Sequence, residues 1–318
     1  MLKESMRVGI LLAVLLGGGL SAAKADTFGS GSNQFTIVFV PISSASNPTG
    51  GYGVVNYDYR IGAYEITNDQ WTKFKNALGI SVTGHPAAAY DADPTGTAAN
   101  VPTNNVSWYE AAQFVNWLNT SNGYHAAYKF TGTQGTSNYT FDTWDTSEAA
   151  GGTNLYRHKN AFYFLPTEDE WVKAAYWNGT SLQTYATKPG DTLHQGNGTN
   201  GTGWNYYVNG FATNPPGPWN VGSGSAELNG TYDMMGNVYE WLESPSSDTS
   251  YGAESNRGVR GGAHNNYANA LASYSRHNNT PVTESETIGF RVASVPEPAS
   301  GGLLLLAGLA FLKRQRPA

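Results

Sequence analysis

Two carboxylates, Asp233 and Glu240, stand at the ends of a short segment that contains a Gly-Asn turn. A chain reversal within this segment would bring the two side chains toward each other. Two negative charges that converge across a tight turn need compensation, and a hard cation supplies it through several oxygen ligands at about 2.3–2.6 Å. The alternative is that Asp233 shapes the turn and Glu240 makes a surface ion pair. We favour the cation.

A second candidate site is the polar stretch between residues 264 and 279, which is rich in Asn, His, Tyr and Arg. Side chains of these types hydrogen-bond and stack without forming a core, and amide groups beside aromatic rings suit peptides or glycans. The alternative is a set of solvated loops that Asn-mediated turns hold in place. The candidate ligand-binding residues are His264, Asn265, Asn266, Tyr267, Arg276, His277 and Asn278.

Other motifs do not indicate chemistry. Residues 196–201 fit G-x-G-x-x-G, but no apolar strand precedes them and no helix follows. Residues 91–96 resemble the start of an EF-hand loop, yet Pro102 stands where the bidentate glutamate belongs. The six histidines show no metal-ligand spacing. Glu110 and Glu170 each follow a Ser or Thr by three residues, which assigns them to helix caps rather than to acid–base catalysis.

Three segments have the pattern of helices, each with a capping box followed by apolar residues at helical spacing. The boxes are Thr67-x-x-Gln70, Ser107-x-x-Glu110 and Thr167-x-x-Glu170. Short β-rich runs lie between and after them. We predict strands at Phe35–Val40, Tyr57–Tyr64, Ala161–Leu165, Val238–Trp241, Gly258–Arg260 and Thr287–Ala293. A few helices among short strands and long ordered loops predict an α+β domain.

The N-terminus has the pattern of a secretory signal. Lys3 and Arg7 precede the apolar run Val8–Leu20. Ala23-Lys24-Ala25 then places small residues at the two positions that a signal peptidase reads, which predicts cleavage before Asp26. Residues 1–25 are therefore expected to be removed by signal peptidase.

The C-terminus resembles a sorting signal. Val295-Pro-Glu-Pro298 precedes an apolar segment at 301–312 and a basic tail at 313–316. Twelve helical residues reach about 18 Å, short of the roughly 30 Å hydrocarbon core, so we expect only transient membrane association. The order of these elements resembles the PEP-CTERM signal, which implies recognition by an exosortase. The protein is then exported across the inner membrane of a Gram-negative bacterium, to the periplasm, the cell surface or the extracellular matrix.

We divide the rest of the chain into an N-terminal extension or edge strand at 26–56, a main domain at 57–294 and the sorting segment at 295–318. Six of the 18 Lys and Arg, but only two of the 24 acids, lie in the two terminal signals, so the mature chain has 12 basic and 22 acidic residues, a net charge of −10. An acidic exported protein is a poor candidate for nucleic-acid binding, which relies on Lys and Arg. The chain has no cysteine, which removes disulfides.

Six motifs occur in order over residues 60–293. They are Tyr64-Glu-Ile-Thr-Asn68, Pro102 with Asn105-Val-Ser-Trp108, Leu165-Pro-Thr-Glu-Asp-Glu-Trp171, Tyr232–Trp241, Arg260-Gly-Gly262 and Gly289-Phe-Arg-Val292. Together they resemble the formylglycine-generating-enzyme family, also called the sulfatase-modifying-factor domain. The resemblance implies an elaborated C-type-lectin-like α+β fold with short twisted strands, about three helices and long ordered loops.

The resemblance also bears on metals. In catalytic members of that family, two cysteines between the last two motifs bind copper. This chain has no cysteine, and Ala263 stands at the place of the family's serine. Soft Cu(I) needs thiolate or thioether ligands, so copper is not expected and no catalytic residue is assigned. The family's calcium site implies Ca²⁺ held by the carboxylates of Asp233 and Glu240 and the carbonyls of Gly236 and Val238.

The sequence therefore predicts an exported, noncatalytic binding or matrix protein whose ligand is a glycan or an exported protein. PEP-CTERM proteins are associated with cells that produce exopolysaccharide. The alternative is a divergent formylglycine-generating-type oxidase, or another metal-dependent enzyme that acts on exported proteins through His264 and His277. A purely structural role, in which the asparagines only shape loops, also stays open.

Overall fold

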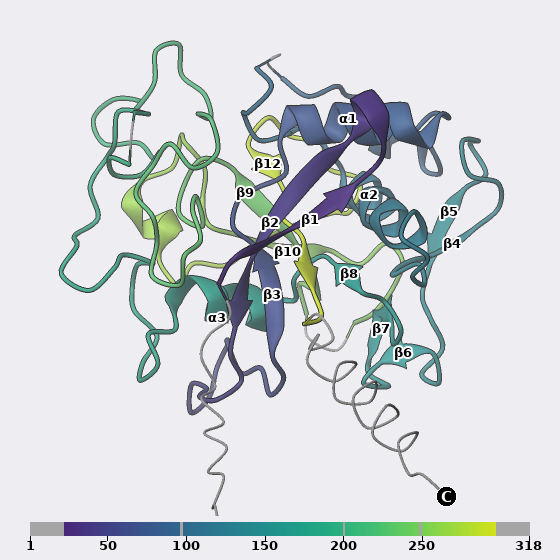
Figure 1. Cartoon of the computed structure of the whole chain (residues 1–318), viewed down its shortest axis with the longest axis horizontal. Coiled ribbons are helices and arrows are strands. Elements are labelled where there is room, and N and C mark those ends of the chain that lie inside the picture. The colour runs from purple at the N-terminus through teal and green to yellow at the C-terminus, as the bar shows by residue number, and fades with distance from the viewer. Residues whose placement is uncertain (1–21, 96–97, 200, 248–249, 297–318) are drawn as a thin grey trace, which may run out of the picture.

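The computed structural model describes residues 22–95, 98–199, 201–247 and 250–296 as a mixed α+β domain (Figure 1). This part of the chain holds three α helices and three 3-10 helices. They are α1 (Asn68–Leu78), α2 (Trp108–Thr120) and α3 (Glu168–Tyr176), with 3-10 turns at Gly31–Asn33, Ala87–Ala89 and Ala268–Leu271. The α+β class and the three helices predicted from the sequence are confirmed.

Each α helix begins with the capping box that its sequence predicts. The side-chain oxygens of Thr67, Ser107 and Thr167 each accept a hydrogen bond from the main-chain N–H three residues later, and that later residue's side chain accepts one in return. The first N–H groups of a helix have no partner within it, so these contacts define where each helix starts. α1 ends at Gly79, whose φ of 70° is the left-handed cap that favours glycine.

The larger sheet has five antiparallel strands in the order β1-β2-β3-β13-β8. Their bounds are β1 (Lys24–Phe28), β2 (Phe35–Ile42), β3 (Tyr59–Gly62), β13 (Ala293–Ser294) and β8 (Tyr163–Phe164). β1 lies at the edge and β2 one strand further in. Residues 26–56, predicted to be an extension or edge strand outside the main domain, thus contribute the end of β1 and all of β2 to its sheet.

The second sheet has four strands in the order β11-β10-β9-β12, with β12 parallel to β9. Its strands are β9 (Tyr239–Pro245), β10 (Arg257–Arg260), β11 (His277–Asn279) and β12 (Ile288–Gly289). Two small antiparallel pairs complete the described strands. They are β4 (Lys129–Thr131) with β5 (Thr140–Asp142), and β6 (Ala149–Ala150) with β7 (Asn154–His158).

Two clusters of buried apolar side chains form the core. One lies under α1 and α2 and includes Trp71, Phe74, Trp108 and Phe114. The other lies under α3 and includes Trp171. α1 and α2 lie toward one end of β2 and α3 toward the other (Figure 1). The helices therefore cover the two buried clusters at opposite ends of β2.

The strand predicted at Thr287–Ala293 is interrupted. It forms β12 and β13, which belong to different sheets, and residues 290–292 connect them. Arg291 in this connection is fully buried and donates hydrogen bonds to Glu240 and to the carbonyls of Gly62 and Tyr232. A buried guanidinium is costly unless it is paired and hydrogen-bonded, and these acceptors pair it.

None of the helices in the described part of the chain has both the length and the apolar character that a membrane span requires. Most of the predicted signal peptide, and the apolar segment and basic tail of the predicted sorting signal, lie outside the described residues. Both signals therefore stay predictions.

Candidate functional site

The segment from Asp233 to Glu240 forms a tight turn that leads into β9. Two non-glycine residues in it have positive φ, Asp233 at 58° and Asn237 at 62°. The Asn237 amide stabilises the turn, because its oxygen accepts from the main-chain N–H of Trp219 (2.8 Å) and its nitrogen donates to Glu65 (2.7 Å). Asparagine tolerates the left-handed conformation, and its amide can accept one hydrogen bond and donate another at the same time.

The carboxylates of Asp233 and Glu240 face protein donors. One oxygen of Asp233 accepts from the indole of Trp219 (2.9 Å) and the other from a main-chain N–H (2.7 Å). Both oxygens of Glu240 accept from Arg291 at 2.6 Å, and one also accepts from the indole of Trp171 (2.8 Å). All four carboxylate oxygens thus have protein partners.

Arg291 is surrounded by more acids than it can neutralise. Glu65, Glu227, Asp233 and Glu240 are at most 2% exposed, and Arg291 acts electrostatically on each of them. Burial raises the pKa of Glu65 and Asp233, and raises the pKa of Glu227 to about 8. An excess of buried negative charge is relieved either by protons or by a cation.

These contacts bear on the calcium site predicted at Asp233, Gly236, Val238 and Glu240. The surplus of negative charge favours a cation. However, calcium takes about six to eight oxygen ligands, and the carboxylate oxygens here already accept from protein donors. As arranged, the two side chains do not fit the ion unless Arg291 releases Glu240. No three His, Asp or Glu side chains in the described part of the chain converge as metal ligands. The calcium site remains a prediction in competition with the ion pair.

Thermal melting in calcium and in a chelator distinguishes a calcium site from the Glu240–Arg291 ion pair. With Glu240 paired to Arg291, we expect the two melting curves to coincide, because a ligand raises the melting temperature only when it binds the folded state. Glu240→Gln should lower the melting temperature equally in both solutions through loss of the ion pair. A higher melting temperature in calcium that Glu240→Gln removes would establish the calcium site instead.

The predicted ligand-binding residues do not all lie together. His264 is 7% exposed, and its Nδ1 lies 3.2 Å from the main-chain oxygen of Asn237. Burial lowers the pKa of His264, so the ring is neutral near pH 7. The side chain of Asn266 accepts from the N–H of Ala263 (2.9 Å) and serves the turn. Asn265 is exposed.

The other predicted residues follow a different path, into β11. Both carboxylate oxygens of Glu168 accept from the Arg276 Nε (2.9 and 2.7 Å), so Arg276 belongs to an ion pair. His277 is exposed and packs edge-on against Tyr239, with ring centroids 5.4 Å apart. Asn278 is exposed as well. The structure thus leaves Asn265 and Tyr267 exposed at one surface, buries His264 and gives Arg276 a role in ion pairing.

Four rings form a continuous row at that surface, and we call Tyr267, Tyr207, Phe211 and His264 the aromatic row. Tyr207 packs edge-on against both Tyr267 and Phe211, at 5.1 Å between centroids in each pair. The Phe211 ring lies 6.4 Å from the His264 ring. Tyr267 is 62% exposed and Phe211 43%. Two shallow hollows flank the row, about 340 Å³ beside Tyr207 and Tyr267 and about 400 Å³ beside Phe211 and His264.

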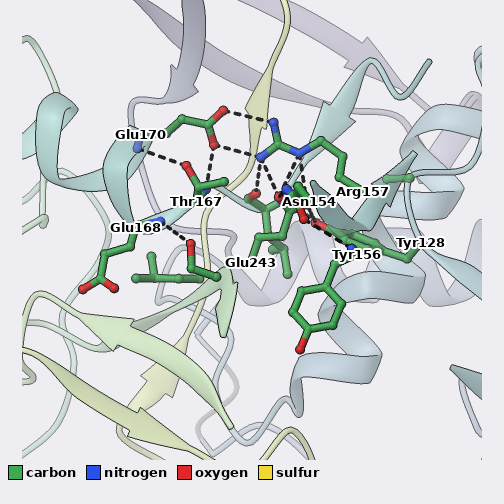
Figure 2. Close-up of polar contacts among 12 residues, drawn as sticks. Tyr128, Asn154, Tyr156, Arg157, Thr167, Glu168, Glu170 and Glu243 are labelled. Carbon is green, nitrogen blue, oxygen red and sulfur yellow. Dashed lines mark hydrogen bonds and ion pairs between the residues drawn. The ribbon is translucent and has the colours of Figure 1, made fainter. Parts of the chain in front are cut away.

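A buried ion network is centred on Arg157 of β7, and no motif in the sequence points to it. Figure 2 shows its guanidinium between Glu170 of α3 and Glu243 of β9. Nη1 and Nη2 donate to Glu170 (3.0 and 2.9 Å), and Nε donates to both oxygens of Glu243 (3.0 and 2.9 Å). Both glutamate side chains are 0% exposed. The guanidinium carbon also lies 3.5 Å from the ring centroid of Phe164.

One guanidinium shared by two carboxylates leaves one negative charge in this network. Burial is the largest single influence on Glu170 and would raise its pKa, but the Arg157 charge and the hydrogen bonds from Arg157, Tyr57 and Thr167 together hold that pKa below its usual value. For Glu243 burial prevails and the pKa is raised. Tyrosine hydroxyls supply further donors, from Tyr57 to Glu170 (2.7 Å) and from Tyr128 to Glu243 (3.0 Å). Glu170 is thus both a helix cap and a partner in the network.

A second network lies beside the first residue of α3. Glu168 is 2% exposed and accepts from Arg260 (2.7 Å) as well as from Arg276. Its carboxylate points away from Arg157 (Figure 2). The ring of Tyr52 lies 5.0 Å from the Arg260 guanidinium. This network has two arginines and one glutamate, whereas the Arg157 network has one arginine and two glutamates. The two therefore have opposite net charges, on either side of the start of α3.

The six ordered motifs now coincide with the capped helices, the turn into β9 and the buried arginines. Residues 14–295 match the model of the sulfatase-modifying factor enzyme 1-like domain. The chain belongs to this family. As a member of the sulfatase-modifying factor family, it has a similarity to the chaperone protein LppX of Paenibacillus barcinonensis. The two are 26% identical over 251 residues, which cover 73% of this chain and 79% of LppX.

Solved structures show the same fold. Treponema denticola variable protein 1 is 23% identical, with a TM-score of 0.58 over 86% of this chain and 99% of that one. CarF is 22% identical, with a TM-score of 0.58 over 82% and 99%. PvdO from Pseudomonas aeruginosa is 17% identical, with a TM-score of 0.53 over 85% and 98%. At these identities the likeness concerns the sulfatase-modifying factor fold alone.

Proposed function

We propose that this member of the sulfatase-modifying factor family is an exported, noncatalytic binding protein whose ligand, a glycan or an exported protein, lies along the aromatic row. The observation that carries this proposal is the exposure of Tyr267 (62%) and Phe211 (43%) beside two hollows. Large rings that gather at a surface mark interaction sites more often than single exposed apolar residues do.

The aromatic row suits a ligand with flat apolar faces and many hydrogen-bonding groups. Tyr207 packs edge-on against Tyr267 and Phe211, so little side-chain freedom is lost when a ligand stacks on these rings. Asn265 and Asn269 are exposed beside the rings and offer both donors and acceptors. Amides next to rigid tyrosines are the residues that adaptable binding surfaces use.

Three observations support a role without catalysis. The chain has no cysteine, so it has no thiolate for copper or for nucleophilic attack. His264 is buried and neutral, with Nδ1 against a main-chain oxygen. His277 packs against Tyr239 and His264 against Phe211, so the two rings have different partners. Export is inferred from the signals predicted at the two ends of the chain.

A binding screen tests the proposal. Purified protein is measured against polysaccharide fractions and secreted proteins of the cells that produce it, beside a Tyr267→Ala/Phe211→Ala variant. We expect binding that the variant weakens by about tenfold or more, because each exposed ring contributes contact area that alanine lacks. Tyr274→Ala is the matched control, since Tyr274 is 72% exposed and lines neither hollow. Binding that survives the double variant unchanged would contradict the aromatic row, and no binding at all would favour a structural role.

A further inference from the structure

A separate cleft of about 710 Å³ lies at the start of α3. Its walls come from the loop before β3, the β6–β7 turn and the segment after β9. Three tyrosines that are at least partly exposed and three polar side chains form part of its surface. They are Tyr52, Tyr57, Tyr251, Thr153, Asn154 and Asp169. None of these residues lines the hollows beside the aromatic row.

Tyr57 is exposed and yet held in place. The residue is 50% exposed, yet its hydroxyl donates a hydrogen bond to the buried Glu170 carboxylate (2.7 Å). Burial of the hydroxyl, together with the Glu170 charge, raises the pKa of Tyr57, so the group remains a donor. Its ring also packs edge-on against the buried Tyr59, at 6.3 Å between centroids. An exposed ring anchored in this way can receive a ligand without losing rotamer freedom.

The two half-buried tyrosines of the cleft, Tyr52 and Tyr251, also pack against buried groups. The Tyr52 ring lies 5.0 Å from the guanidinium of Arg260 and 5.5 Å from that of Arg276. The Tyr251 ring packs at 4.8 Å against Tyr156. Both tyrosines are half-buried. The cleft therefore presents fixed aromatic faces rather than mobile side chains.

The charged groups at the cleft are bound within the protein. Arg157 is held by two glutamates, and Glu168 by two arginines. Lys159 donates to a main-chain carbonyl (2.7 Å), and Asp169 accepts from a main-chain N–H (2.8 Å). Burial lowers the pKa of His158, so its ring is neutral near pH 7. A charged ligand that pairs with Arg157 or Glu168 would have to displace these partners, whereas a neutral ligand would not.

We propose that this cleft is a second binding site, for a neutral oligosaccharide that stacks on Tyr57 and hydrogen-bonds to the exposed Thr153. Pyranose rings have apolar faces that stack on aromatic rings and hydroxyl groups that pair with amides and hydroxyls. The 710 Å³ of the cleft lies within the range of small-molecule sites. The site is independent of the aromatic row, because the two share no lining residue.

Titration calorimetry of the full chain tests the cleft with defined probes. The neutral probes are cellohexaose, maltohexaose and mannohexaose, the acidic probe is an oligogalacturonate, and the peptide probe is an uncharged hexapeptide. We expect at least one neutral hexasaccharide to bind, and Tyr57→Ala to weaken it by about tenfold or more. Tyr57→Phe keeps the ring and loses only the anchor, so a smaller loss is expected.

Thr153→Trp gives a test that leaves the Arg157 network intact. Thr153 is exposed at the cleft, and a tryptophan there should block the cleft while melting stays native-like. Tyr267→Ala and Tyr274→Ala should not change the binding. The proposal is overturned if no neutral probe binds, if Thr153→Trp binds as well as the native chain, or if the loss follows Tyr267→Ala, which would assign the sugar to the aromatic row. It is also overturned if only the acidic or the peptide probe binds in the cleft.

Discussion

Replacing Arg157 with alanine is expected to lower the free energy of unfolding by about 3–5 kcal/mol, the usual cost of breaking a buried ion pair from one side. The variant leaves Glu170 and Glu243, both 0% exposed, without the guanidinium that compensates them. It also removes the contact with the Phe164 ring. Because typical domains are stable by only about 5–15 kcal/mol, a loss of this size affects folding itself.

Denaturant unfolding measures the effect, and Arg276→Ala is the matched control. Arg276 is also an ion-pair partner of a buried glutamate, but Glu168 keeps Arg260 when Arg276 is removed. We expect that control to lose about 1–2 kcal/mol. Equal losses in the two variants would show that the Arg157 network contributes no more to the free energy of unfolding than the Arg276 ion pair does.

The pH dependence gives a further check on Arg157→Ala. In the native chain Arg157 holds the pKa of Glu170 down, so this stabilisation is present at neutral pH and is lost as the pH falls through the folded pKa. In the variant, burial without a cation raises the carboxylate pKa values, so the folded state takes up protons as the pH falls and regains stability. The difference between the two proteins should therefore shrink between neutral pH and about pH 5.

Gly236→Ala is expected to lower the free energy of unfolding by about 3 kcal/mol or more. A Cβ at this position would lie 2.1 Å from the main-chain oxygen of Asn205, and φ is 83°. That oxygen cannot move easily, because it accepts from the N–H of Asn237 (2.8 Å). The clash is therefore with fixed main chain, in the turn that leads to Glu240.

Gly230→Ala is the matched control for this substitution. Its φ of 85° is nearly the same, but the nearest atom to its Cβ is a methyl carbon of Val40 at 3.6 Å, an ordinary contact. The control should lose only the cost of the left-handed conformation, about 1–2 kcal/mol. Thermal or denaturant unfolding measures the stability of both variants, and the difference between their losses is the cost of the clash with the Asn205 oxygen at Gly236. If both variants lose the same stability, the approach of Asn205 is not a constraint.

Local signals in the sequence located many elements of the fold. The three capping boxes each act within four residues, so their sequence alone specifies where α1, α2 and α3 begin. The runs predicted as strands coincide with β2, β3, β8, β9 and β10 within a few residues. The ordered motifs resembled the sulfatase-modifying-factor family, and the match over residues 14–295 confirms it. Caps, alternation and motif order depend on near neighbours, which a single sequence displays.

Contacts between distant residues had no such signal. Glu170 was recognised as a cap, but its partner Arg157 lies in β7, where no motif stands out. Glu243 lies 86 residues from Arg157 along the chain. Likewise, one polar stretch suggested one ligand surface, yet His264 packs beside Phe211 whereas Arg276 turns to Glu168. β11 leads the second half of that stretch away from the first.

The sequence by itself therefore determined the family, the α+β class, the helix starts and the residue types available for binding. The tertiary structure decided which charges meet, which rings remain exposed and where the hollows lie. The reason is physical. A cap or a turn is satisfied by groups a few residues away, whereas a buried charge such as Arg157 or Arg291 takes whichever carboxylates the packed sheets and helices bring to it.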